Sequence, residues 1–142
     1  MSEVRLNSDV IRYIALFESI TGARAKDCYE DTDGRLLFVV KNGDMGIAIG
    51  KGGEHINRVR KSIGKHIEII EHSDNPVEFV KNAFHPFSVK KADVVIKDDK
   101  RIAYVEVLTK EKGLAIGRDG RNIEKIKKLC RRHHNIDDVI IQ

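Results

Sequence analysis

The sequence predicts an α+β fold in which two similar units follow one another along a chain of 142 residues. The first observation behind this prediction is an internal repeat: a glycine-rich segment at residues 46–56 recurs at residues 113–123, 67 positions later. The second is that strand-like apolar runs precede each copy and a helix-like run follows it. We therefore expect two small domains, over residues 1–73 and 74–142.

In the first unit the expected order is helix, strand, strand, helix, glycine turn, helix, strand. Apolar residues spaced three or four apart predict the helices, and continuous or alternating apolar runs predict the strands. Capping residues and an Asp33-Gly34 turn mark the boundaries, with Asp44 as the expected cap of the middle helix. Helices are predicted over residues 10–20, 45–49 and 56–63, and strands over residues 25–30, 36–40 and 66–71.

The first helix should present Val10, Ile11, Ile14, Phe17 and Ile20 to the core. A cap is available from Asn7, Ser8 or Asp9, and Gly22 should end the helix.

The second unit begins at a short joint, Ser73-Asp74-Asn75-Pro76, in which Asp74 or Asn75 can cap a helix that starts at Pro76. The pattern of the first unit then repeats. Strands are predicted over residues 89–96, 102–108 and 138–141, and helices from about 111 and up to about 132. Because the joint lacks a Gly/Ser tether, we expect the two units to pack as one rigid unit.

Each glycine turn combines backbone freedom with positive charge. Glycines remove the side chains that would keep another backbone away, and the N–H groups at the start of the following helix can meet an anion. Lys51 and Arg118 place a cation at the same position of the two turns. Seven of 18 positions are identical between residues 46–63 and 113–130. The requirements of the fold alone would not obviously preserve a cation at this position of both turns. The expected ligand is therefore an extended anion.

The positive charge of the chain is concentrated on these two segments. The net charge is +3 over residues 44–65 and +5 over residues 113–134, whereas the whole chain carries only +4. Charged helices often simply have solvated faces, but here the charge coincides with the repeat. This distribution favours a nucleic-acid partner.

The repeated pattern resembles the KH domain, whose signature is Ile-Gly-x-x-Gly-x-x-Ile. It occurs here at residues 49–56 and 116–123, and the preceding helix and two strands resemble the type II arrangement, α-β-β-α-α-β. The whole chain, as two tandem type II KH domains, resembles the archaeal NusA-like transcription factors. The closer match is carried by residues 113–123 and 131–139.

The resemblance implies that each glycine turn clamps the backbone of about four single-stranded RNA nucleotides while the bases face an adjoining groove. Glycines would hold the sugar-phosphate, isoleucines would line the floor under the bases, and basic residues would supply charge. The implied RNA-binding residues are Ile49, Gly50, Lys51, Gly52, Gly53, Ile56, Ile116, Gly117, Arg118, Asp119, Gly120, Arg121 and Ile123. The implied role is in transcription elongation or termination, with RNA polymerase as a possible partner.

Asp119 departs from this pattern because it places an anion inside the second turn. It would weaken phosphate binding there unless its side chain points away or caps the following helix, as aspartate can. Glu54, at the start of the helix after the first turn, poses the same question of phosphate repulsion in a milder form. An acid at this position also interacts favourably with the helix dipole.

The sequence indicates no enzyme, no catalytic residues, no cofactor, no metal site and no small-molecule substrate. The glycine spacing fits neither a P-loop nor a dinucleotide-binding fingerprint. The adjacent His133 and His134 point in different directions on a helix. Cys28 and Cys130 form no metal or redox motif and suit a reducing cytoplasm. No apolar run is long enough to span a membrane.

Two other functions remain open at this point. The KH folds could form a protein scaffold that docks on RNA polymerase without binding RNA. Alternatively, the chain could bind RNA in ribosome assembly, which requires the same extended single strand.

Overall fold

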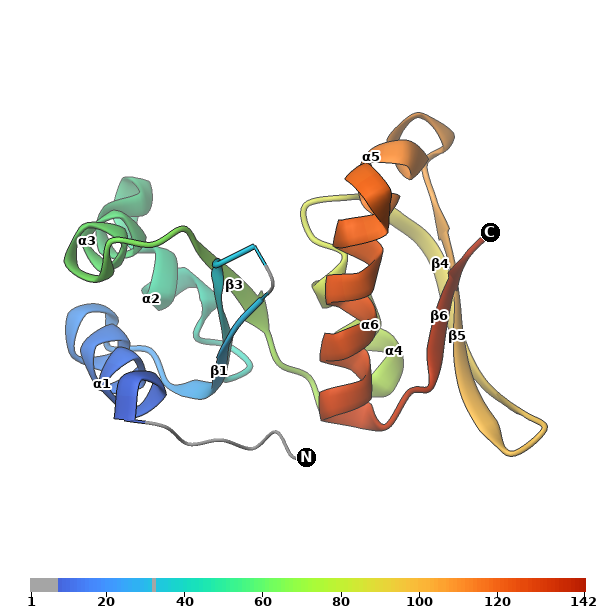
Figure 1. The fold of residues 1–142 in the computed structure, drawn as a ribbon, viewed down its shortest axis with the longest axis horizontal. Helices are drawn as coiled ribbons and strands as arrows, with labels where there is room; N and C mark the ends of the chain where they lie inside the picture. The colour runs from blue at the N-terminus through green and yellow to red at the C-terminus, as the bar shows by residue number, and fades with distance from the viewer. Residues whose placement is uncertain (1–7, 32) are drawn as a thin grey trace. The chain divides into compact units, whose positions relative to one another are not determined.

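The computed structural model describes residues 8–31 and 33–142 (Figure 1). The chain divides into two compact units, one ending at His72 and the other spanning Ser73–Gln142. Each unit contains a three-stranded sheet with helices on one face, so the predicted α+β class is confirmed.

The first unit has the element order α-β-β-α-α-β, with a short 3-10 turn between its last two helices. Its elements are α1 (Ser8–Thr21), β1 (Ala25–Glu30), β2 (Leu36–Val40), α2 (Met45–Ile49), η1 (Lys51–Gly53), α3 (Glu54–Ile63) and β3 (Ile67–Glu71). Strand β2 lies in the middle of the sheet, antiparallel to β1 and parallel to β3. A parallel pair needs a crossover connection, and here the α2–turn–α3 segment supplies it.

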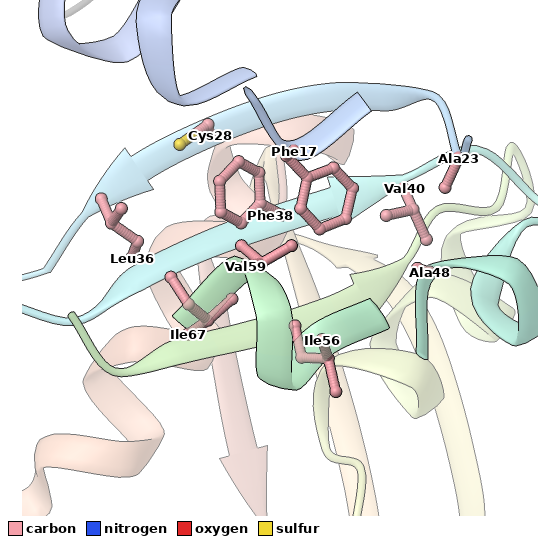
Figure 2. Close-up of a cluster of buried hydrophobic side chains, with 10 residues drawn as sticks. All are labelled: Phe17, Ala23, Cys28, Leu36, Phe38, Val40, Ala48, Ile56, Val59 and Ile67. Atoms are coloured by element: carbon pink, nitrogen blue, oxygen red, sulfur yellow. The ribbon is translucent and has the colours of Figure 1, made fainter. Parts of the chain in front are cut away.

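The core of the first unit lies between the sheet and the helices α1 and α3 (Figure 2). Phe17 of α1 stacks on Phe38 of β2, with ring centroids 4.3 Å apart, and both side chains are fully buried. Ile56 and Val59 of α3 join the same cluster. This packing holds α3 on the sheet and therefore fixes the position of the turn that precedes it.

The second unit repeats the first. Its elements are α4 (Pro76–Ala83), β4 (Val89–Lys97), β5 (Lys100–Val107), η2 (Thr109–Glu111), α5 (Lys112–Ile116), η3 (Arg118–Gly120), α6 (Arg121–His134) and β6 (Asp138–Ile141). Strand β5 is antiparallel to β4 and parallel to β6, as in the first sheet. Helix α4 contacts α6 as α1 contacts α3.

Two expected helix boundaries are confirmed by their hydrogen bonds. Asn75 caps α4, since its Oδ1 accepts the Glu78 N–H at 3.1 Å. Gly22 follows α1 with φ +79°, and its N–H donates to the Glu18 carbonyl at 2.9 Å.

Two expectations about side chains are wrong. Asp44 precedes α2 but makes no side-chain cap; its Oδ2 instead accepts the Arg24 N–H at 2.8 Å, which ties α2 to the segment after α1. Ile11 is 55% exposed because it lies about 100° around the helix from Val10, outside the core-facing stripe. Asn7, one of the three expected caps of α1, lies outside the described residues.

Candidate nucleic-acid interface

The two glycine turns follow the same backbone path. Gly50 has φ 78° and ψ 170°, and Gly117 has 85° and 167°. Two left-handed residues come later in each turn: Gly52 and Gly53 in the first, Asp119 and Gly120 in the second. The second α-helix of each pair then starts immediately. The sequence repeat is therefore also a repeat of backbone conformation.

The first glycine of each turn is required by a close approach. A Cβ on Gly50 would lie 2.7 Å from the His55 ring and 2.8 Å from the His55 backbone nitrogen. A Cβ on Gly117 would lie 2.7 Å from the Asn122 backbone nitrogen. The backbone angles of both residues also fall in a region that is essentially restricted to glycine.

The middle position of the turn has no such neighbour. A Cβ on Gly52 would meet nothing within 4 Å, so this side of the first turn is open to an approaching ligand. Asp119 occupies the equivalent place with φ 55°, a left-handed conformation that aspartate tolerates better than most residues. The two turns therefore differ here in chemistry but not in backbone shape.

A hydrogen bond braces each turn from the following helix. The ring Nδ1 of His55 lies 2.7 Å from the Ile47 carbonyl, and Asn122 Nδ2 donates to the Ala115 carbonyl at 2.8 Å. Sequence reasoning did not identify His55 and Asn122 as part of the site. The sequence does contain a pattern that indicates this role: both residues occupy the second position after the last glycine, and both carry a side chain able to donate a hydrogen bond.

Within each turn, the first backbone N–H group that donates a hydrogen bond belongs to the last glycine. Gly53 N–H donates to the Gly50 carbonyl and Gly120 N–H donates to the Gly117 carbonyl, both at 3.1 Å. The preceding amides, at positions 51–52 and 118–119, come before the first donor of the helical turn. Such groups have no partner within the helix and can bind an anion.

The predicted isoleucines divide into exposed and core residues. Ile49 and Ile116 end the helices before the turns and are 39% and 36% exposed. Ile56 is buried in the first core, and Ile123 is half-buried. Sequence analysis missed Ile47 and Leu114, which are 49% and 68% exposed on the same short helices. An apolar surface therefore adjoins each turn.

The three predicted cations Lys51, Arg118 and Arg121 are all exposed, and so is Asp119. Asp119 does not cap α6: the cap position belongs to Gly120, and no side-chain hydrogen bond caps this helix. Of the two roles considered for Asp119, the cap is therefore wrong, and its negative charge lies at the surface of the second turn.

Other kinds of site find no support among residues 8–31 and 33–142. They contain no group of three or more His, Cys, Asp or Glu side chains that could hold a metal ion. Both cysteines are buried, and burial raises the pKa of the Cys130 thiol to about 12. Within the same residues, every helix is too short or too polar to traverse a bilayer.

Comparison with known proteins places this geometry in a family. A KH-domain model matches residues 11–82, and a model of the NusA-like second KH domain matches residues 76–141. Together they cover nearly all of the described chain. The chain belongs to the NusA-like family of tandem KH-domain proteins.

Relatives of this NusA-like chain occur in several archaea. A protein of Halobacterium salinarum named "Probable transcription termination protein NusA" is 40% identical, with 96% of each chain covered. A protein of the same name from Methanocaldococcus jannaschii is 34% identical over 98% of this chain and 75% of its own length. The crystal structure of APE1850 matches with a TM-score of 0.80 and 33% identity, covering 96% of this chain and 100% of that one. The two tandem type II KH domains are thus confirmed.

Proposed function

We propose that this chain is a single-stranded RNA-binding factor of transcription elongation or termination, and that it grips the RNA backbone with its two glycine turns. The observation that carries the proposal is the identical backbone path of the two turns, each with an exposed cation inside and a basic helix behind. The role in transcription is supported by the name shared by the archaeal relatives.

In the proposed complex the sugar-phosphate backbone passes over the open middle position of the first turn. Free amides at residues 51–52 and the positive end of the α3 dipole face the phosphate, and Lys51 adds a full charge. The bases then lie against the exposed apolar side chains of Ile47 and Ile49. Ile56 supports this surface from the core rather than touching the bases.

The second turn offers the same backbone amides and positively charged side chains, but it has an acidic side chain where the first turn has Gly52. Arg118 and Arg121 attract the backbone, whereas the exposed Asp119 carboxylate repels it. We therefore infer that the second turn binds a phosphate more weakly than the first. RNA polymerase or another protein of the transcription machinery is the proposed partner of the RNA-bound chain.

Fluorescence anisotropy with labelled single-stranded RNA over a salt series tests this function, with DNA and duplex RNA as competitors. We expect preference for single-stranded RNA and a log–log salt slope of about −0.7 for each phosphate contacted. The double variant Lys51→Asp/Gly52→Asp should weaken binding about tenfold or more. Asp119→Asn should strengthen it about twofold to fivefold by removing the repulsion.

The matched control is Ala15→Asp/Lys26→Asp, which changes the net charge by the same amount at exposed positions of α1 and β1. It should leave affinity nearly unchanged. Circular dichroism verifies that each variant folds. Unchanged affinity of a folded Lys51→Asp/Gly52→Asp variant would remove the first turn from the site. Absence of binding to any single strand at low salt would instead favour a protein scaffold.

A further inference from the structure

Each glycine turn follows a short helix that ends just before it. Helices α2 and α5 have five residues each, and the next residue, Gly50 or Gly117, turns the chain away with φ 78° or 85°. The next α-helical hydrogen bond of α2 would run from the Lys51 N–H to the Ile47 carbonyl, and this change of direction prevents it. The last carbonyls of a helix have no donor within the helix and need one from elsewhere.

A side chain from the following helix supplies this donor. His55 is the second residue of α3, and its ring Nδ1 lies 2.7 Å from the Ile47 oxygen. Because a carbonyl can only accept, the hydrogen must lie on Nδ1. The second unit achieves the same with another residue type: Asn122, the second residue of α6, donates through Nδ2 to the Ala115 oxygen at 2.8 Å. In both units a side chain thus caps the short helix from across the turn.

The capped carbonyls are the ones that amides of the turn would otherwise use. In an α-helix the N–H of a residue donates to the carbonyl four residues earlier. The Ile47 oxygen would therefore pair with the Lys51 N–H, and the Ala115 oxygen with the Asp119 N–H. Lys51 and Asp119 are both exposed, and their amides are among those that the proposed function assigns to phosphate. The capping side chain and the turn amide therefore compete for one carbonyl.

The competition has a consequence for the ligand. Extending α2 by one residue would also satisfy the Ile47 carbonyl, but it would draw the Lys51 N–H into the helix. When His55 takes the carbonyl instead, this N–H stays outside the helix, where water or an anion can accept from it. Histidine and asparagine do this in the two units, so the two turns share the hydrogen bond and not the residue type.

We propose that His55 and Asn122 are positioning residues for the RNA backbone. Each caps the helix before its turn and so keeps an amide of that turn, at Lys51 or at Asp119, available to a phosphate. The inference rests on the proposed RNA-binding function and adds to it the reason why these amides stay available. Neither side chain needs to touch the RNA.

Fluorescence anisotropy with labelled single-stranded RNA measures the effect on binding. His55→Ala removes the cap, and we expect about tenfold weaker binding, which is the effect of losing one hydrogen bond to a charged group. His55→Asn should restore most of the affinity, because asparagine makes the equivalent bond in the second turn. The control His66→Ala removes an exposed histidine that lies beyond the other end of α3, and it should leave the affinity unchanged.

Amide hydrogen exchange of Lys51, followed by NMR, separates positioning from simple bracing. In His55→Ala we expect this N–H to exchange about tenfold more slowly or slower still, because it pairs with the vacated Ile47 carbonyl. A side chain that only braced the turn would have the opposite effect, since its loss would loosen the turn and speed exchange. His55→Asn should exchange like the unaltered chain. Asn122→Ala should slow exchange of the Asp119 N–H in the same way.

Circular dichroism verifies that each variant folds. The inference would be overturned if a folded His55→Ala chain kept its affinity, if its Lys51 N–H exchanged as fast as before or faster, or if His55→Asn bound as weakly as His55→Ala. Those results leave the proposed function standing. If the unaltered chain bound no single-stranded RNA, the proposed function would fail, and this inference with it, whatever the exchange rates.

Discussion

At the scale of single residues, the glycines of one turn serve different purposes. Gly50 has a backbone conformation that other residues rarely adopt, and the His55 backbone and ring leave no space for a Cβ. Gly52 has open space around it, and its counterpart in the second turn is Asp119. The first glycine is thus needed for folding, whereas the middle position is free for ligand contact.

This difference predicts unequal costs for two alanine substitutions. Gly50→Ala should lower the free energy of unfolding by about 3 kcal/mol, because backbone strain and steric overlap add. Gly52→Ala should cost about 1 kcal/mol, since it only places an alanine in the left-handed region. Denaturant unfolding followed by circular dichroism measures both. Equal costs for the two variants would contradict the assignment.

At the scale of elements, α6 is divided lengthwise between a core face and a charged face. Ile126, Leu129 and Cys130 are fully buried on one side, whereas Lys128 and Arg132 are exposed on the other. Burial disfavours the thiolate and raises the pKa of Cys130 from 9.0 to about 12. The folded chain thus retains a thiol proton that the unfolded chain loses above its own pKa.

Two results follow for Cys130. At pH 8 iodoacetamide should modify it very slowly in the folded chain and rapidly in denaturant, as counted by intact mass. Because the folded state binds the proton more tightly, stability should fall as the pH rises from about 9 toward 12. A Cys130→Ala variant should lack this contribution. Rapid labelling of Cys130 in the folded chain would show that the α6 core face opens readily.

At the scale of the whole molecule, the repeat provides two clamps within one chain. Only residues 72–75 separate β3 from α4. We predict that one long RNA engages both turns, whereas short strands occupy them separately. Titration at concentrations above the dissociation constant should then give one twelve-nucleotide strand but two four-nucleotide strands per chain. Two long strands per chain would contradict this prediction. The rigid packing of the two units likewise stays a prediction.

Much of the fold could be predicted because its signals are local. Helical spacing, the continuous apolar run of β2 and the Asn75-Pro76 start of α4 depend on neighbouring residues only. The strands β1, β2 and β6 have the bounds that the pattern predicts. The glycine turns could be found because each needs specific residue types at fixed spacing, and because the motif occurs twice.

The remaining features depend on contacts between residues far apart in the sequence. Asp44 is close enough to cap α2, but the folded chain brings the Arg24 amide to its carboxylate. Lys127 and Lys128 look alike in the sequence, but the folded chain brings Asp138 of β6 to within 3.3 Å of Lys127.

The sequence by itself therefore determined the family, the order of elements and the positions of the two clamps, since short-range patterning encodes each of these. Only the tertiary structure decided which glycine is sterically required, which isoleucines are exposed and which lysine of α6 lies beside Asp138. Steric overlap, burial and charge balance depend on which distant segments are packed together, and local sequence patterns do not specify those partners.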